Sequence, residues 1–494
     1  MNRNTMTLDL FIQTVRFEEI ARYAKPGFRL PVYQIMQADF LTPTMAYLRL
    51  RHSGKASFLL ESVIKGRQMG RYSFLGHNPV DLLVQGHASE SASSPDFFNR
   101  LQQKLDEEPL IHLPGLPRFN GGAVGYIGFD MIRQIERIPA PKPDAIGIPD
   151  ALMAFYNELI AFDHVKSQVY LIRLIDIDNL SSLQAQYDKA VNQLNQLQEK
   201  LLDERPLHLR PFEAKNETLQ SNQSKEQFEQ SVRTVIEHIY AGDIFQAVLS
   251  QRFSMEYSGD VFQVYRALRS INPSPYMFFM DFGTFQFLGT SPEPLVRLEQ
   301  NRLEIIPIAG TRQRGQSEAE DIALEQDLIN DPKERAEHIM LVDLARNDLG
   351  RVSRPGSVKV HDLLTIERYS HVMHLISRVT GELKERAKSV DAFKAAFPAG
   401  TVSGAPKIRA MEIINDLEPD KRSFYAGAAG YFDYSGNMDT CIAIRSMLAK
   451  DGVLYWQAGA GIVADSIPEK EYQEIINKGK ALLKAIQKAS RGKS

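Results

Sequence analysis

The way in which strand-like segments and long helices follow one another most constrains the fold of this chain. Apolar and polar residues alternate from Ile244 to Arg252, which predicts a strand with two different faces. Residues 276–281, 285–289 and 303–308 are strand-like as well, and Gly, Asn and Gln residues separate them. Because strands and helices do not alternate as regular βαβ units, the sequence predicts an α+β fold with largely antiparallel sheets.

A polar segment between two predicted helices divides the chain. The first helix carries one apolar stripe with spacings of three and four residues, made by Leu183, Tyr187, Ala190, Leu194, Leu197 and Leu201. The second begins at Ser224, which has Gln227 three residues later, as in a capping box. The segment from Asp203 to Gln223 is rich in charges, amides and prolines, so we predict an interdomain connection between domains at 1–215 and 216–494.

The charge balance and the single cysteine restrict the partners and the compartment. The 494 residues contain 58 Lys and Arg against 61 Asp and Glu, a formal net charge of −3, so the chain lacks the basic surface that nucleic-acid binding requires. There is no run of about 18 apolar residues, and residues 1–19 lack the apolar stretch of a secretory signal, so we expect neither a membrane span nor export. Cys441 cannot form an internal disulfide and belongs to no C-x-x-C motif, which fits a reducing cytoplasm and disfavours a thiolate zinc site.

Acidic residues on two predicted helices are candidate metal ligands. Glu337 follows a helix start at Asp331-Pro332, and Glu471 and Glu474 share one face of a second helix because they are three residues apart. Mg²⁺ prefers a few carboxylates, several waters and an anionic substrate, so carboxylates from two helices are sufficient for a site. Solvated surface positions are the alternative for all three glutamates.

Four glycine-bearing stretches are candidate anion-binding loops. They cover residues 307–311, 399–407, 425–431 and 457–462. Small residues let backbone amides approach an anion, and threonine hydroxyls add donors. Neither a P-loop spacing nor G-x-G-x-x-G between a strand and a helix occurs, so the sequence does not support an ATP or NAD site. Tight turns in a β-rich domain are the alternative.

Two basic side chains each have two possible interpretations. Arg445 lies in an otherwise apolar segment that we predict to be a strand, where its partner is either a ligand carboxylate or a structural Asp or Glu. His374 is either a general acid or base, or a histidine of the core. The residues alone leave both alternatives open.

Taken in order, these segments resemble the chorismate-utilising enzyme family, and specifically its anthranilate-forming branch. The resemblance rests on residues 289–293, 307–311, 337–348, 371–374, 400–407, 439–445 and 458–463, on Glu471 and Glu474, and on residues 59–62 and 70–73. It covers nearly the whole chain. It implies a four-layer α/β/β/α sandwich with mostly antiparallel sheets and the active site between the sheets.

The resemblance implies a two-step reaction on chorismate. Chorismate and ammonia give 2-amino-2-deoxyisochorismate, from which pyruvate is eliminated to leave anthranilate. Mg²⁺ is expected on Glu337 and Glu474 with Glu471 nearby, and Glu293 is expected to protonate the leaving C4 hydroxyl. His374 is expected to take part in the elimination.

The resemblance also implies contacts to both ends of chorismate. The expected contacts to the enolpyruvyl carboxylate are made by Tyr425, Arg445, Gly459 and Gly461. The expected contacts to the ring end are made by Gly310, Thr311 and Thr401.

Two positions separate the branches of this family. Where isochorismate and salicylate synthases have a Lys that activates water, this chain has Gln246, which cannot act as a base. Ammonia already has its lone pair and needs no such base. Where aminodeoxychorismate synthases commonly have a Lys, this chain has Ala309.

The N-terminal motif and residues 272–277 resemble the tryptophan feedback pocket of this branch. The expected contacts to the inhibitor are made by Glu61, Ser62, Pro275, Tyr276 and Met277. Cys441 lacks the Gly-rich elbow and the His partner of a glutaminase, so a separate glutamine amidotransferase subunit is expected to supply ammonia. An aminodeoxychorismate synthase component and a non-catalytic tryptophan-binding regulatory subunit remain the alternatives.

Overall fold

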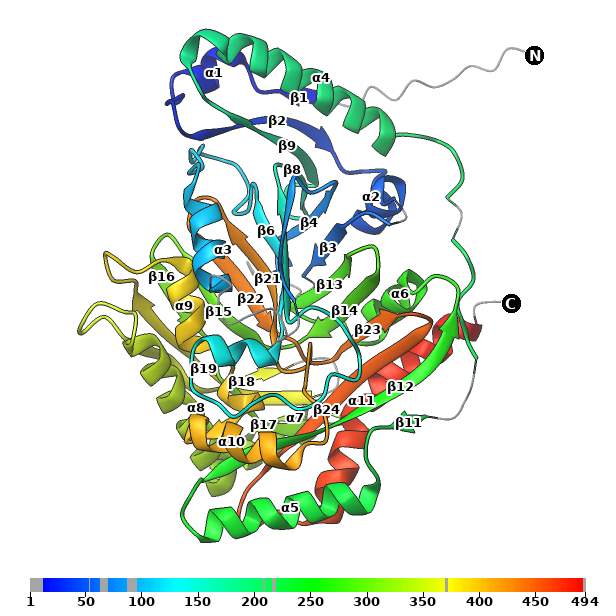
Figure 1. The fold of residues 1–494 in the computed structure, drawn as a ribbon, viewed down its shortest axis with the longest axis vertical. Helices are drawn as coiled ribbons and strands as arrows, with labels where there is room; N and C mark the ends of the chain where they lie inside the picture. Colours follow the sequence, from blue (N-terminus) through cyan, green and yellow to red (C-terminus); the bar gives the residue numbers. More distant parts are fainter. Residues whose placement is uncertain are drawn as a thin grey trace.

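Two large antiparallel sheets form the centre of the molecule (Figure 1). The structure is a computed structural model that describes residues 12–52, 54–62, 70–86, 96–207, 209–215, 219–368 and 372–491. Within these ranges, all pairings between neighbouring strands are antiparallel.

The first sheet takes strands from both halves of the chain. Its order is β1 (Ile12–Thr14), β2 (Arg29–Gln37), β9 (Gln168–Asp176), β8 (Glu158–Asp163), β4 (Tyr72–His77), β3 (Ser57–Glu61), β13 (Tyr276–Asp281), β14 (Phe285–Ser291), β23 (Ser446–Lys450), β24 (Val453–Ile462), β12 (Gln246–Ser258) and β10 (Glu213–Ala214), and β11 (Gln220–Ser221) and β20 (Gly404–Ala405) also pair with β12. The predicted strands over 276–281 and 285–289 are confirmed as β13 and β14.

The second sheet is smaller, and it also takes strands from both halves of the chain. Its order is β17 (Ile308–Gln313), β19 (Val372–Glu382), β16 (Arg302–Ile305), β15 (Pro294–Glu299), β22 (Met438–Ile442), β21 (Ala428–Asp433), β6 (Gly122–Ile127), β7 (Ala151–Tyr156) and β5 (Asp81–Gln85), and β18 (Lys359–Arg368) pairs with β19. The strand predicted over 303–308 is divided into β16 and β17 around Pro307, whose backbone has no N–H to donate to a ladder.

Helices cover the outer faces of both sheets. Those that contact the first sheet are α2 (Pro43–Leu50), α4 (Leu183–Leu201), α5 (Lys225–Tyr240), α6 (Phe262–Ile271), α10 (Lys407–Leu417) and α11 (Pro468–Arg491). Those that contact the second sheet are α3 (Phe97–Asp106), α7 (Glu318–Asn330), α8 (Pro332–Gly350) and α9 (Ser389–Ala396). The short helix α1 (Phe17–Ala21) and the 3-10 turns η2 (Phe129–Gln134), η3 (Leu180–Ser182) and η4 (Gly400–Val402) complete the elements. The predicted α+β sandwich is confirmed.

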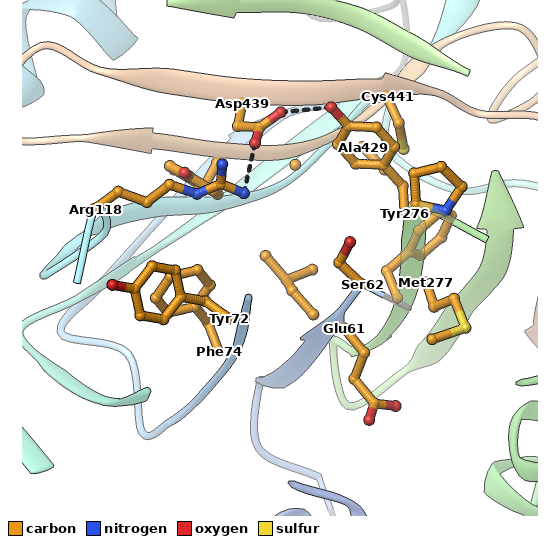
Figure 2. A pocket seen from close by; sticks show the side chains of 15 residues that line it. Glu61, Ser62, Tyr72, Phe74, Arg118, Tyr276, Met277, Ala429, Asp439 and Cys441 are labelled. Atoms are coloured by element: carbon orange, nitrogen blue, oxygen red, sulfur yellow. Dashed lines mark hydrogen bonds and ion pairs between the residues drawn. The ribbon is translucent and has the colours of Figure 1, made fainter. Parts of the chain in front are cut away.

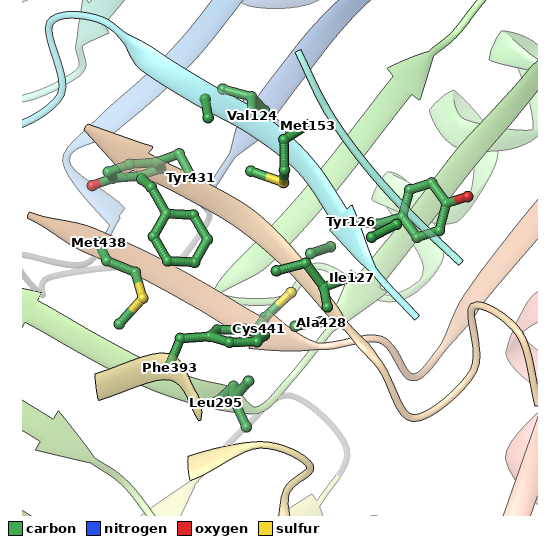
Figure 3. Close-up of a cluster of buried hydrophobic side chains, with 14 of the residues drawn as sticks. Val124, Tyr126, Ile127, Met153, Leu295, Phe393, Ala428, Tyr431, Met438 and Cys441 are labelled. Carbon is green, nitrogen blue, oxygen red and sulfur yellow. The ribbon is translucent and has the colours of Figure 1, made fainter. Parts of the chain in front are cut away.

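The alternation of side chains along the strands produces two apolar cores. On β3, Phe58 belongs to the core between the sheets, whereas Leu59 belongs to the core between the first sheet and its helices. Aromatic rings connect the sheets across the inner core, where the Tyr126 and Phe287 ring centroids are 5.6 Å apart. Figure 3 shows this core around Tyr126 and Tyr431, with Phe393 of α9 beside the second sheet.

Both helices that flank the polar segment are as predicted. Leu194, Leu197 and Leu201 of the apolar stripe are buried, and the capping box between Ser224 and Gln227 is present. The predicted boundary at Asn216 lies outside the described residues, and the division into 1–215 and 216–494 stays a prediction. Strands from both sides of it pair directly, since β3 pairs with β13 and β6 with β21.

The helices give no sign of a membrane segment. Across the described ranges, none of them combines the length and the apolar character that crossing a bilayer requires.

Candidate active site

Glu293 lies at the junction between the two sheets. The chain leaves β14 of the first sheet at Ser291 and enters β15 of the second at Pro294, and the Ile442 amide donates to the Glu293 carbonyl (3.0 Å), which fixes the junction against β22. Burial raises the pKa of the Glu293 carboxyl to about 7, although Thr401 and Lys478 both lower it. A carboxyl with this pKa is partly protonated at neutral pH and can donate a proton.

Arg445 directs a guanidinium toward the same region from a strained backbone position. It lies between β22 and β23 with φ +51°, so the prediction of a continuous strand is wrong here, because a left-handed residue interrupts the ladder. Its Nη1 donates to the Lys478 carbonyl (2.7 Å). Burial lowers the Arg445 pKa, while Tyr425 and Glu474 raise it. Among the described residues no carboxylate forms an ion pair with Arg445, which argues against the structural Asp or Glu alternative.

Two glycines on β24 allow the close approach of neighbouring groups. A Cβ at Gly459 would lie 2.8 Å from the Tyr425 hydroxyl, and a Cβ at Gly461 would lie 2.5 Å from Gln246 Nε2. Any other residue would therefore displace these side chains. The Gln246 Oε1 atom is buried and has no hydrogen-bond partner among the described residues, so an acceptor is available beside Gly461.

His374 lies on β19, between β17 and β18 of the second sheet. In the β17–β19 ladder it lies opposite Thr311, and its Nδ1 lies 3.0 Å from both the Thr311 hydroxyl and the Gly310 carbonyl. Gly310 has φ +69°, at an irregularity in the register between Ala309 and Thr311. Burial lowers the His374 pKa, against the effect of the Gly310 carbonyl, so the ring is neutral at neutral pH.

Carboxylates from α8 and α11 face one another. Burial is the main cause that raises the pKa of Glu337, and Glu334 and Glu474 add to it. Burial likewise raises the pKa of Glu471, with a further contribution from Glu474. Glu474 thus affects the pKa of both other predicted ligands, and the role of the three glutamates in metal binding stays a prediction.

The donor set of this cluster suits a hard cation. It offers carboxylate oxygens only, and Mg²⁺ takes few of these and completes its shell with water and substrate oxygens. Over the described ranges, no three Asp, Glu, His or Cys side chains are grouped closely enough to hold a metal ion by themselves. Any cation bound by these carboxylates would therefore need further ligands, such as water.

Lys478 is a central residue that sequence reasoning missed. Its ammonium lies 2.6 Å from Glu474 Oε1 and donates to the Gly459 carbonyl (2.8 Å). Its charge lowers the pKa of Glu293, Glu337 and Glu471. The available signal was the i,i+4 spacing from Glu474, which places a cation on the same helix face as the acidic pair.

A separate cavity opens between β3, β13 and the second sheet (Figure 2). All five residues predicted for the inhibitor line it, namely Glu61, Ser62, Pro275, Tyr276 and Met277. The Ser62 hydroxyl oxygen is buried and has no partner among the described residues. Across the cavity, Asp439 accepts from the Tyr276 hydroxyl (2.8 Å) and pairs with Arg118 (3.0 Å). Sequence reasoning did not anticipate this Asp439 and Arg118 pair.

The Glu61 side chain does not point into this cavity. Figure 2 shows its carboxylate pointing away from Ser62 and Asp439. The carboxylate accepts from the Tyr265 hydroxyl (2.7 Å) and pairs with Arg269 (2.8 Å), both on α6. Because successive side chains of a strand point to opposite faces, Glu61 and Ser62 cannot both face the cavity. Only the Glu61 backbone is placed to contact a ligand there.

The fold and the site together define the class of the protein. A family model described as chorismate binding enzyme matches residues 55–484, and the chain belongs to this family. Anthranilate synthase component 1 of Acetivibrio thermocellus is 45% identical, over 96% of this chain and 98% of that protein. The protein of the same name from Pseudomonas putida is 44% identical, over 95% of this chain and 98% of that protein.

Two solved structures have the same architecture. Anthranilate synthase component I from Streptococcus pneumoniae TIGR4 superposes with a TM-score of 0.75 at 41% identity, over 90% of this chain and 98% of that chain. The menaquinone-specific isochorismate synthase MenF from Escherichia coli superposes with a TM-score of 0.69 at 20% identity, over 94% of this chain and 97% of that chain, which shows a shared fold alone.

Proposed function

We propose that this chain is the chorismate-binding component of anthranilate synthase, a lyase that converts chorismate and ammonia into anthranilate and pyruvate for tryptophan biosynthesis. The observation that carries the proposal is a carboxyl of raised pKa, Glu293, in one cluster with Arg445, Lys478 and the carboxylates of α8 and α11. Two relatives named anthranilate synthase component 1, which are 44–45% identical over nearly the full length, support it.

In the first step, Glu293 protonates the hydroxyl that leaves C4 while ammonia adds to the ring at C2. Hydroxide is a poor leaving group, so delivery of this proton lowers the barrier directly. Arg445 presents a planar fork that suits a substrate carboxylate, and the small Gly459 lets that carboxylate approach Tyr425. Gln246 Oε1 can accept a hydrogen bond from the incoming ammonia. An amide is not a base, so Gln246 would not activate water as a competing nucleophile.

In the second step, pyruvate leaves and the ring becomes aromatic. We assign proton movement in this step to His374, because a neutral imidazole can accept a proton. Thr311 and the Gly310 carbonyl hold Nδ1 and thereby fix the ring orientation.

Mg²⁺ is the proposed cofactor, held by Glu337 and Glu474 with Glu471 nearby. When bound there it would neutralise the ring carboxylate of chorismate and the charge that develops as the hydroxyl leaves. Lys478 already forms an ion pair with Glu474, so it can remain as a second cation close to the dianionic substrate.

Ammonia is proposed to come from a separate glutamine amidotransferase subunit. Glutaminases of this kind need a reactive thiolate. Burial raises the pKa of the Cys441 thiol to about 12, so this cysteine is protonated at neutral pH. A single buried cysteine also fits the cytoplasmic location that we propose.

A product assay with the purified chain tests this function. With chorismate, Mg²⁺ and an ammonium salt, anthranilate fluorescence is expected to rise without an added lyase, and EDTA is expected to abolish the rise. Glutamine in place of ammonium is expected to give almost no product. An aminodeoxychorismate product would contradict the proposed reaction. Efficient use of glutamine by the isolated chain would contradict the need for a partner subunit.

Tryptophan is the proposed feedback inhibitor, bound in the cavity at Ser62. The Ser62 hydroxyl and Asp439 offer polar contacts, and Pro275 and Met277 offer an apolar wall. Inhibition would then be a coupling free energy between this cavity and the site at Glu293.

Replacing Ser62 by arginine is expected to abolish inhibition by tryptophan and to leave much of the turnover intact. The long cationic side chain would fill the cavity, whose lining contains no residue of the proposed catalytic cluster. Inhibition curves with ammonium as the nitrogen source measure the effect. Ser167→Arg, on the exposed turn between β8 and β9, is the matched control and should be inhibited like the wild type. Normal inhibition of Ser62→Arg would place the inhibitor elsewhere.

A further inference from the structure

Arg422 is a buried charged residue that the proposed mechanism does not use. It is 2% exposed, and it lies in the segment between α10 and β21. An isolated buried guanidinium would be costly, so its partners indicate what it stabilises.

The Arg422 fork connects segments that are distant in sequence. Its Nε and Nη2 donate to Glu418 (2.9 and 2.7 Å). Its Nη1 donates to the Val402 carbonyl (2.7 Å), and Nη2 also donates to the Val248 carbonyl (2.5 Å). Burial opposes the charge of Arg422, but Glu418, Tyr425 and Asp130 together outweigh it, so the Arg422 pKa is raised and the residue stays charged.

Glu418 extends this network to β12 and β24. It is 6% exposed and accepts from both the amide and the hydroxyl of Ser250 (2.9 and 2.6 Å). The Gln457 side chain donates to the same hydroxyl (2.7 Å). The carboxylate of Glu418 is thus held by the Arg422 fork and by one strand of the first sheet.

Each segment held in this way carries a residue of the candidate active site. Val402 follows Thr401, a predicted substrate contact whose buried hydroxyl has no hydrogen-bond partner among the described residues. Val248 lies opposite Gly461 and Ser250 lies opposite Gly459 in the β12–β24 ladder. The Arg422 guanidinium also lies 5.7 Å from the centroid of the Tyr425 ring.

We infer that Arg422 and Glu418 form a buried positioning pair, which sets the spacing between the Thr401 turn and the glycine-bearing strand β24 in the proposed chorismate site. The inference rests on the proposed function. Arg422 is enclosed by protein, so it acts through the residues that it holds and not by contact with substrate. Misplacement of binding groups by about 1 Å can lower catalytic efficiency by about 100-fold.

Arg422→Lys tests the inference, because lysine keeps the charge and loses the fork that bonds Val402, Val248 and Glu418 together. With ammonium as the nitrogen source, we expect kcat/KM for chorismate to fall by about 100-fold, mainly through a higher KM. Glu418→Gln keeps the size of the side chain and is expected to change KM in the same direction. If Arg422→Lys does not fold, Glu418→Gln alone tests the inference.

Arg252→Lys is the matched control. Arg252 is also buried and charged. It lies on β12, and its Nη2 donates to Asp420, whose carboxylate also accepts from the Asn222 side-chain amide. It connects β12 to Asp420, in the segment that follows α10 and carries Arg422, and through Asp420 to Asn222, so this control alters another link to the same segment but not the bond to Val402. We expect this variant to lose thermal stability, as Arg422→Lys does, and to keep the wild-type KM.

Three outcomes are distinguishable. A raised KM in folded Arg422→Lys or Glu418→Gln, with a wild-type KM in Arg252→Lys, supports a positioning role. Chorismate KM within about twofold of wild type in both folded test variants would falsify it and leave a stabilising role only. Failure of the wild-type chain to form anthranilate would instead reject the proposed function.

Discussion

Replacing Glu293 by glutamine is expected to lower kcat for anthranilate formation by about 10²- to 10⁴-fold, which is the usual contribution of a positioned general acid. The amide has nearly the shape of the carboxyl and cannot deliver a proton to the leaving hydroxyl. Chorismate binding is expected to change little, because Arg445 and the glycines of β24 remain. Steady-state fluorescence measures kcat, and titration calorimetry measures chorismate binding.

Glu299→Gln provides the control for this experiment. Glu299 lies at the far end of the same strand, β15, where it pairs with Arg297, and its substitution should leave kcat unchanged. Near-normal turnover of Glu293→Gln would require another proton donor.

The wild-type pH profile provides an independent test of the same residue. The raised pKa of Glu293, about 7, means that its carboxyl is mostly protonated below that pH and ionised above it. An acid acts in its protonated form, so kcat is expected to fall as pH rises through about 7, and Glu293→Gln should lose this limb. Lys478 and Tyr425 are the charged or titratable groups that face Glu293, and burial raises the pKa of Tyr425 to about 12, far from neutral pH.

Replacing Arg445 by glutamine is expected to lower kcat/KM for chorismate by at least about 30-fold, mainly through KM. Loss of one partner of a buried, hydrogen-bonded charge pair costs about 2–5 kcal/mol, and 2 kcal/mol corresponds to about 30-fold. Arg445→Lys, which keeps the charge without the planar fork, should have an intermediate effect. Initial rates over a range of chorismate concentrations give both constants.

Arg378→Gln is a suitable comparison for Arg445→Gln. Arg378 is a half-exposed arginine of β19 near Glu304, and its loss should leave the chorismate KM unchanged. An unchanged KM in Arg445→Gln would show that the substrate carboxylate binds elsewhere.

Local sequence signals predicted local structure well. The helix at 183–201, the capping box at Ser224 and the strands at 276–281 and 285–289 depend on periodicity and short-range hydrogen bonds, and all are present. The order of the strands was not predictable in the same way. Pairs such as β3 with β13 join segments more than 200 residues apart, and their register depends on the packing of the whole core.

The candidate site shows the same limit at the level of single side chains. The motifs identified the segments that meet around Glu293, but they did not reveal the left-handed backbone of Arg445. Nor did they reveal that the Glu61 side chain bonds to α6 and leaves only the Glu61 backbone at the cavity. Both depend on the tertiary contacts of one residue, and so does the central position of Lys478.

The interleaving of early and late strands in both sheets has a consequence for how this protein can evolve. Removal of the N-terminal part would leave β13 and β21 as bare edges, with hydrogen-bonding groups and apolar side chains open to water and to other chains. The strand that ends beside Ser62 is therefore also part of the scaffold that catalysis needs. The proposed inhibition by tryptophan can therefore be lost through point substitutions around the cavity, whereas loss of the N-terminal strands would disrupt both sheets.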